Sequence, residues 1–206
     1  MSRKYTTIPT DAFQKISKNA GILLADFDPN DGTVTKTAII GATTGGISFK
    51  DTPSYADYGE DIDNCPKNTK ELKEIDSREV TISGTFITVD TDSAKKLIAA
   101  ADIDSNDNTK IVPRDVLGED DFIDDIWVVT DYSDVDGGFV AVHIMNALST
   151  GGFAIQTADK NKGQYAFTFT AHYSISDPDE VPYEIYIKAG EAGEAEEETP
   201  GTTTQN

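Results

Sequence analysis

Apolar and polar residues alternate along the segment 163–176. In an extended chain one face of this segment carries aromatic and apolar side chains: Tyr165, Phe167, Phe169, Tyr173 and Ile175. The opposite face carries small polar side chains: Thr168, Thr170, His172 and Ser174. A period of two residues is typical of a β-strand with one buried face, so we predict a strand here.

Three other long segments are free of Asp, Glu, Lys and Arg and are rich in β-branched and aromatic residues: 37–49, 80–89 and 137–158. This composition, interrupted by glycines, indicates further strands. In 80–89 the apolar phase includes Val80, Ile82 and Phe86, and the polar phase consists of Thr81, Ser83 and Thr85. The phase breaks after Phe86, which predicts a bulge or a strand end. The glycines of 41–46 predict a bulge or the close approach of another backbone.

Shorter apolar patterns predict strands at 21–27, 123–132 and 181–188. A helix is expected within 90–104, with Thr91 or Asp92 as the N-cap, because its apolar residues repeat at helical spacing. These residues are Ala94, Leu97, Ile98 and Ala101. Another helical turn is expected at 68–75, where Leu72 and Ile75 share a face. The pattern predicts a mainly β protein, an antiparallel β-sandwich or barrel with one flanking α-helix.

The segment 51–67 is polar, contains two prolines and has no periodicity, which predicts a long loop. Beyond residue 190 the chain is rich in Glu, Gly and Thr and lacks large apolar residues, so we expect a flexible acidic tail over 190–206. The length of 206 residues fits one domain, placed at 1–189.

Composition narrows the function. There are 37 acidic residues against 17 Lys and Arg, which gives a formal net charge of −20. The negative electrostatic field of such a chain repels nucleic-acid phosphates. Cys65 is the single cysteine, so no internal disulfide or cysteine-based metal site is expected. The N-terminus lacks the apolar run of a secretory signal. No segment approaches about 20 apolar residues, so no membrane span is expected.

Candidate catalytic chemistry is sparse. His143 and His172 both fall in predicted strands, without a neighbouring nucleophile in the sequence. The acidic turns at 26–32 and 102–108 fail the Ca²⁺-loop pattern at its sixth and twelfth positions. Hydrolysis by a carboxylate pair would need two acids placed across a cleft. We therefore expect no cofactor, no metal and no enzymatic activity.

Faces of Thr and Ser without charge are unusual for exposed strands of so acidic a chain. Small neutral side chains suit a surface that another protein covers closely. The predicted interface or lumen face comprises Thr81, Ser83, Thr85, Thr168, Thr170, His172 and Ser174. The alternative is that both faces of these strands are buried in one thick core. Unlike patches that associate head to tail close into rings, and rings can then stack.

The chain resembles the major tail protein, or tail tube protein, of long-tailed phages and prophages of Gram-positive bacteria. The resemblance lies in the order and wording of these segments: NAGILLADFDP, IIGATTGGISF, DIDNCPKNTKELK, ISGTFITV, IVPRD, DIWVV, GGFVAVHIMNALSTGGFAIQT and GQYAFTFTAHYSI. The resemblance spans about residues 19–188. It implies a sandwich that assembles into hexameric rings, with one sheet of each copy joining its neighbours around a lumen.

The resemblance also implies that the rings stack through an N-terminal arm, about 1–18, and a long loop, about 50–75. The stacking residues expected in this loop are Tyr55, Tyr58, Asp61, Asn64, Cys65 and Pro66. The implied partners are further copies, a tape-measure protein, and the tail terminator and distal tail proteins. DNA would pass through the lumen of the virion tail without specific binding, past an acidic lining that repels it. Assembly is expected in the host cytoplasm.

Three alternatives remain open from the sequence. The chain could be another ring-forming component of a tail, or the tube protein of a secretion system. It could also be a monomeric β-sandwich that binds carbohydrate or calcium. Whether Thr168 and Thr170 line the lumen or the seam between copies is left undecided.

Overall fold

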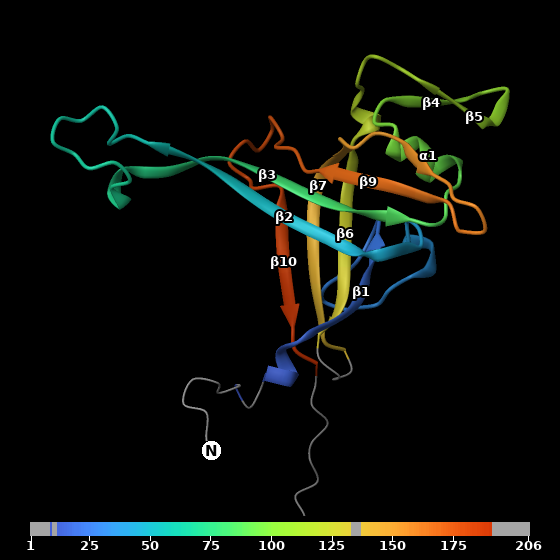
Figure 1. Cartoon of the computed structure of the whole chain (residues 1–206), viewed down its shortest axis with the longest axis horizontal. Coiled ribbons are helices and arrows are strands. Elements are labelled where there is room, and N and C mark those ends of the chain that lie inside the picture. Colours follow the sequence, from blue (N-terminus) through green and yellow to red (C-terminus); the bar gives the residue numbers. More distant parts are fainter. Residues whose placement is uncertain (1–8, 10–11, 133–136, 191–206) are drawn as a thin grey trace, which may run out of the picture.

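The computed structural model describes residue 9 and residues 12–132 and 137–190. The chain forms one eight-stranded antiparallel sheet that folds over itself into a sandwich (Figure 1). Sheet A has the order β10-β7-β6-β1, with the strands Tyr183–Lys188, Phe139–Ser149, Ile123–Tyr132 and Ser17–Leu24. Sheet B has the order β2-β3-β9-β8, with the strands Thr43–Asp57, Lys73–Phe86, Gln164–Thr170 and Ala154–Gln156.

The end of β7 pairs with β9 and so joins the two sheets, but the sheet does not close into a barrel. The predicted mainly β class with one flanking helix is confirmed. None of the helices in the described ranges is long and apolar enough to cross a membrane.

The main core lies between the two sheets. Phe167 and Phe169 of β9 are buried there, and Phe167 stacks on Phe86 of β3 with ring centroids 4.3 Å apart. Ile126 and Ile144 of sheet A face the same core. The aromatic side of the segment 163–176 therefore fills the sandwich, as its alternation predicts, but β9 ends at Thr170.

A second, smaller core covers the opposite face of sheet A. The connection 25–42 between β1 and β2 crosses this face and buries Phe27 against Trp127 and Phe139. The ring centroids lie 5.6 Å and 5.2 Å from that of Phe27. The chain thus covers both faces of sheet A over much of its area.

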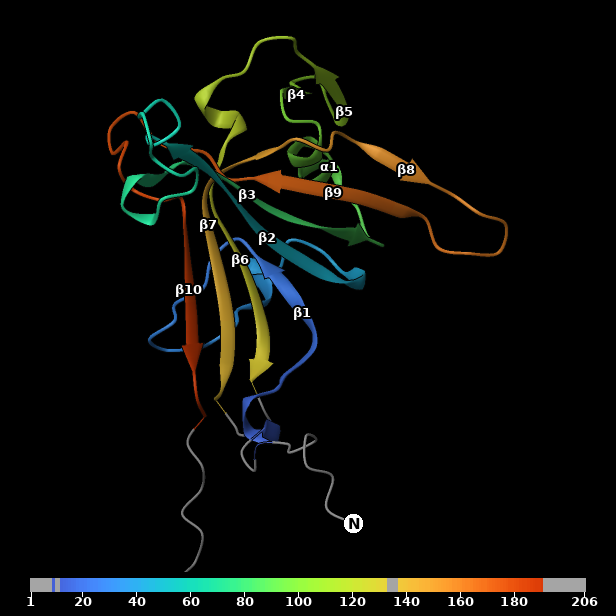
Figure 2. The ribbon, with the colours of Figure 1, turned by 60° about the vertical axis from the view of Figure 1, so that its left-hand side comes forward.

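Strands β2 and β3 continue beyond sheet B as a two-stranded arm (Figures 1 and 2). We call residues 51–80 the arm. The loop predicted over about 50–75 is wrong in its bounds, because β2 runs to Asp57 and β3 starts at Lys73. A two-stranded ribbon that is exposed on both faces needs no alternation of apolar and polar residues, so its strands cannot be recognised from that alternation. The connection is 58–72, and its Lys70–Leu72 turn is a 3₁₀ helix followed by strand, not a turn of α-helix.

The root of the arm is fixed to sheet A. Asp51 of β2 pairs with Arg78 of β3 and accepts a hydrogen bond of 3.0 Å from the hydroxyl of Tyr183 in β10. The Tyr183 ring also packs on Phe49, with centroids 5.5 Å apart. Burial and the Asp51 hydrogen bond raise the pKa of Tyr183, so the hydroxyl stays protonated and keeps donating. The direction of the arm is therefore set by side-chain contacts.

Among the described residues the one α-helix is α1, which spans Thr91–Leu97 and packs Leu97 into the main core. Its N-cap is Asp90, not Thr91 or Asp92: the Asp90 carboxylate accepts from the Ser93 amide at 2.8 Å. Hydrogen bonds from Ser93 lower the pKa of Asp90. Ala99 adopts a φ of 66° just past the helix, which explains its early end. Ala101, predicted on the helix stripe, lies instead in a strand.

That strand belongs to a hairpin absent from the sequence prediction, formed by β4 (Ala101–Asp104) and β5 (Asp107–Pro113). Two predictions about strand irregularities hold. Gly45 and Gly46 have positive φ at a register shift of β2, and the phase break after Phe86 is the end of β3. The strand predicted at 21–27 lies earlier, at Ser17–Leu24.

Candidate assembly surfaces

Sheet B carries hydroxyl side chains on the face turned away from the core. We call Thr81, Ser83, Thr85, Thr168 and Thr170 the hydroxyl face. In the sheet register Thr81 lies opposite Thr170, and Ser83 lies opposite Thr168. All five residues are half-buried, and no described element covers them. The alternative of one core burying both faces of these strands is wrong.

Little charge accompanies the hydroxyl face. Its rows continue into β2, where Ser48 lies opposite Ser83 and Lys50 opposite Thr81. In the next row outward, Glu79 of β3 lies opposite Thr52 of β2. One lysine and one glutamate at neighbouring rows balance each other, so the face is close to neutral although the chain carries −20. The acidic residues gather elsewhere, on the arm and around the β4–β5 hairpin.

Two residues predicted on this face do not join it. His172 lies beyond the end of β9, where its ring meets Phe122 edge-on at 5.5 Å. Its Nδ1 lies 3.3 Å from the Asn146 carbonyl oxygen. Ser174 makes a hydroxyl contact with Ser176 at 2.6 Å. The end of pairing at Thr170 separates these side chains from the face.

Sheet B has two free edges, β2 on one side and β8 on the other. Pro53 lies in β2, and a proline is tolerated in a strand when its nitrogen faces away from the neighbouring strand. Donors alternate along an antiparallel strand, so the amides of Asp51, Phe49 and Ile47 point the same way. These groups line the open edge of β2 and are available to a further strand.

The predicted stacking residues lie on the arm. Tyr58 and Ile62 are exposed at its turn, by 63% and 50%, and Tyr55 lies within β2 under the ammonium of Lys73. Asn64 takes a φ of 61° in the turn, and Asp61 beside it is exposed. The half-buried Cys65 thiol lies 3.5 Å from the Thr69 hydroxyl, which donates to the Pro66 carbonyl at 2.7 Å.

Asp57 organises this turn. Its carboxylate accepts from the amide of Asn68 at 2.8 Å and from that of Gly59 at 3.0 Å. These backbone hydrogen bonds, that from Asn68 first, lower the pKa of Asp57. The turn is thus a structured tip with its apolar side chains directed outward.

The sequence prediction missed a cluster around His143. The buried imidazole lies parallel to the Trp127 indole, with centroids 4.0 Å apart. Its Nε2 donates to Asp125 at 2.5 Å, and its Nδ1 lies 3.6 Å from Glu184. These acids come from β6 and β10, so only the strand register brings them to His143. The contacts found for the ring include no hydroxyl or thiol nucleophile in the described ranges, so the cluster does not form a catalytic triad.

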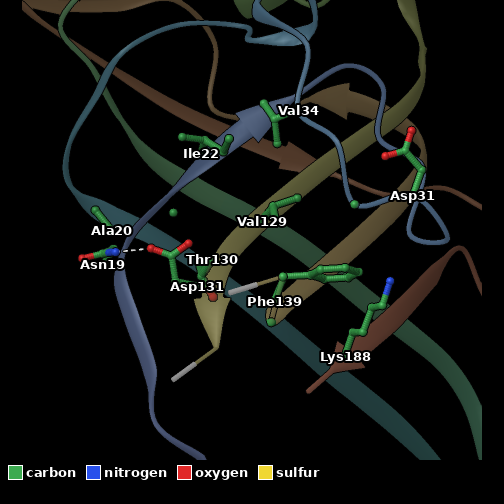
Figure 3. Close-up of a pocket in the computed structure, with 14 residues that line it drawn as sticks. Asn19, Ala20, Ile22, Asp31, Val34, Val129, Thr130, Asp131, Phe139 and Lys188 are labelled. Carbon is green, nitrogen blue, oxygen red and sulfur yellow. Dashed lines mark hydrogen bonds between the residues drawn. The ribbon is translucent and has the colours of Figure 1, made fainter. Parts of the chain in front are cut away.

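A pocket of about 450 Å³ opens between β1, β6 and the connection 25–42 (Figure 3). Ile22, Val129 and Phe139 give it apolar walls, and Asp131 accepts a hydrogen bond from Asn19 at its rim. The Lys188 ammonium lies 5.8 Å from the centre of the Phe139 ring. Within the described residues no group of three His, Cys, Asp or Glu side chains is placed to hold a metal ion.

Two parts of the sequence prediction fall largely in segments that the structure does not describe. They are the N-terminal arm, predicted at about 1–18, and the C-terminal tail, predicted at 190–206. In the described part of this predicted N-terminal arm, Ala12–Lys15 form a 3₁₀ helix, and β1 begins at Ser17.

No family model matches the chain, and no curated protein matches it. Among solved structures it is similar to a chain of the virion of a native gene transfer agent particle, with a TM-score of 0.38 and 11% identity over 75% of this chain and 92% of that one. It is also similar to a chain of the tail of an empty gene transfer agent particle with C6 symmetry, with a TM-score of 0.38 and 11% identity over 82% and 96%. At TM-scores this low, neither similarity contributes to the function proposed for this chain.

Proposed function

We propose that this chain is a structural subunit of a phage-type tail tube. Copies associate side by side through the edges of sheet B into a ring, and rings stack into a conduit for DNA. The observation that carries the proposal is the combination, in one sheet, of two free edges and an uncovered, neutral hydroxyl face. The sequence resemblance to tail tube proteins supports the same function.

Lateral association follows from the edges. β2 of one copy and β8 of the next each present unpaired backbone groups, and pairing them continues sheet B across the boundary between copies. Repeating this contact with a rotation closes a ring and leaves no exposed edge. Six copies per ring is the number that the resemblance implies.

The hydroxyl face then lines the lumen. Sheet B is covered on its other face by the main core, so the face carrying Ser83 and Thr168 turns toward the axis of the ring. A lining of Thr and Ser is nearly neutral, not acidic as the overall composition predicts. Such a surface offers no cationic groups to hold phosphates, so a hydrated duplex slides past it.

The partners follow from this position. A tape-measure protein would occupy the lumen during assembly, and tail terminator and distal tail proteins would contact the two ends of the tube. DNA would pass without specific binding. The protein would assemble in the cytoplasm of a host bacterium and reside in the virion tail.

Electron microscopy of the purified full chain tests the proposal. Because each copy carries −20, repulsion opposes assembly at low ionic strength and is screened by salt. We expect monomers in dilute buffer, and rings or tubes at high protein concentration in about 0.5 M salt, where the Debye length is a few ångströms. Sedimentation velocity quantifies the shift.

Monomers at every salt and protein concentration, also with other tail proteins added, would refute the proposal. A monomer whose melting temperature rises with calcium or sugars would support the binding-module alternative instead. A neighbouring tape-measure gene would distinguish a tail tube protein from a secretion-system tube protein.

A further inference from the structure

The hairpin of β8 and β9 has apolar side chains that the described part of the chain leaves largely uncovered. Ile155 of β8 lies opposite Tyr165 of β9, and the Phe153 ring lies 6.0 Å from that of Tyr165. Tyr165 packs against the main core, so all three side chains lie on the core side of sheet B. Ile155 and Phe153 are nevertheless 56% and 42% exposed. This edge of sheet B thus has apolar side chains without a second layer packed on them.

A matching exposed surface lies on β10. Tyr183, at the start of this strand, lies under the edge of β2, where its ring packs on Phe49 and its hydroxyl contacts Asp51. From there β10 runs out beyond β2, past the area that sheet B covers (Figure 1). Ile185 and Ile187 follow at alternate positions, so they share the side of Tyr183. They are 51% and 65% exposed.

The strand pairing of the proposed function places these two surfaces opposite each other. β2, β3, β9 and β8 are antiparallel in turn, so the β8 of one copy meets the β2 of the next in antiparallel orientation. The regular open edge of β2 lies between Pro53 and the register shift at Gly45 and Gly46. Tyr183 lies under this same stretch. The incoming β8 therefore lies above the point where β10 leaves the sandwich.

Strand spacings give the extent of the overlap. Neighbouring strands of a sheet lie about 5 Å apart, so the incoming β8 and β9 lie about 5 Å and 10 Å beyond β2. Two residues of a strand advance about 7 Å, so Ile185 and Ile187 lie about 7 Å and 14 Å from Tyr183 along β10. Because β10 crosses the direction of β2 steeply, it carries them away from the edge of β2 (Figure 1). The hairpin of the next copy therefore covers these isoleucines.

We propose that the β8–β9 hairpin of each copy completes the sandwich core of its neighbour in the ring, with Phe153 and Ile155 packed on Ile185 and Ile187. The inference rests on the proposed function and assigns the side-chain contacts of the seam, which strand pairing alone leaves open. Burial of the four side chains adds hydrophobic stabilisation to the backbone hydrogen bonds between copies. The contact joins two different surfaces, so it repeats around the ring.

The charged residues near this seam lie off the apolar contact. Glu184 and Lys188 alternate with the two isoleucines and face the other side of sheet A. Asp51, at the end of the β2 edge, is already paired with Arg78. Within β8 and β10 no charged side chain shares the face of the four apolar residues. The connection beyond the end of β8 carries the nearest charges of the hairpin, Asp159, Lys160 and Lys162.

Cross-linking between two single-cysteine variants tests the contact. Both carry Cys65→Ser, and one adds Ile155→Cys while the other adds Ile185→Cys. They would be mixed as full-length chains, assembled in high salt and treated with a short bis-maleimide, whose spacer relaxes the strict geometry of a disulfide. We expect a dimer with a bond between positions 155 and 185, identified by mass spectrometry, in the mixture alone. Because each chain has one thiol, this bond cannot form within a copy.

The matched control replaces Ile185→Cys with Val116→Cys. Val116 is 73% exposed, so its thiol is at least as accessible to the reagent. It follows β5, which lies at the opposite end of the molecule from the end of β10 (Figures 1 and 2). We expect no bond between positions 155 and 116.

Charged substitutions test the energetics. Ile155→Glu and Ile185→Lys each bury one unpaired charge in the seam, and each should reduce the fraction of rings by about tenfold or more. The lysine lowers the net charge of −20 and so weakens repulsion between copies, which makes a loss of rings specific to the contact. Both residues are half exposed in the single copy, so folding is retained, as circular dichroism would check. Val116→Glu adds the same charge as Ile155→Glu and should leave the rings unchanged.

The double variant brings the two opposite charges together across the seam. Rings should therefore recover above the level of either single variant, a non-additivity that only residues in contact produce.

Rings that form normally from both single variants, with no bond between 155 and 185, would overturn the seam inference and leave the tail-tube proposal standing on strand pairing. Dimers joined only through two copies of position 185 would show a symmetric contact and also overturn the inference. Failure of the native chain to form rings or tubes would refute the proposed function, and the seam inference with it.

Discussion

The outer faces of the two sheets differ in what covers them. Sheet A turns Trp127 and Phe139 outward, and the chain covers them with its own connection 25–42. Sheet B turns hydroxyls such as Ser83 and Thr168 outward, and no described element covers them. A chain that can bury large aromatics under its own backbone has left the second face small and neutral. Under the proposed function, the outer face of sheet A serves the folding of the chain, and the outer face of sheet B meets another molecule.

The largest expected effect concerns the outer face of sheet A. Phe27→Ala removes the ring that Trp127 and Phe139 pack against, and a cavity in this position costs about 3–5 kcal/mol of unfolding free energy. Urea denaturation measures the loss. Thr168→Ala on the outer face of sheet B is the control, expected within about 0.5 kcal/mol of the native chain. Equal losses in the two variants would abolish the contrast.

A smaller effect compares two adjacent residues of β3. A Cβ added at Gly84 would lie 2.7 Å from the Phe167 ring, so Gly84→Ala overpacks the core and should cost about 1–3 kcal/mol. The preceding residue, Ser83, points away from the core, and Ser83→Ala should change stability by less than about 0.5 kcal/mol. Thermal unfolding of both variants checks that Gly84 faces the core and Ser83 faces away from it. A larger loss of unfolding free energy in Ser83→Ala would reverse this assignment.

The smallest expected effect on folding is that of Ser83→Glu, a variant that tests whether the hydroxyl face lines a lumen or a seam between copies. Ser83→Glu should change the unfolding free energy by less than about 0.5 kcal/mol. If the face lines a lumen, rings still form but require more salt, because each copy adds one acid around the axis. Loss of rings at every salt concentration would instead place Ser83 in the seam between copies. Electron microscopy across a salt series distinguishes the two results.

The sequence predicts best where one face of a strand is buried. The alternation around Phe167 identifies the core side of β9, and the phase break after Phe86 marks the end of β3. It predicts the arm poorly, because a ribbon exposed on both faces imposes no period on residues such as Tyr55. The capping position illustrates a finer error: Asp90, Thr91 and Asp92 are all suitable caps, and only backbone geometry selects Asp90.

Contacts between distant segments lie beyond periodicity. Asp125, His143 and Glu184 come from three strands, and their meeting depends on register that no local pattern encodes. The same holds for Asp51 and Tyr183, which lie 132 residues apart and together fix the arm. The exposure of Ile185 and Ile187 in β10 is also hidden from sequence reasoning, since both residues are typical of buried strands. Only the extent of sheet B shows that they are left open.

Pro53 sets a limit on how copies can join. The open edge of β2 offers amide donors at Ile47, Phe49 and Asp51, and the next position on that side has none. An incoming strand therefore loses its ladder where the arm leaves the body, after about six residues, or roughly 20 Å. Pro53 therefore stops strand pairing between copies before it extends along the arm as in an amyloid-like fibre. The arm is left free to contact a different copy.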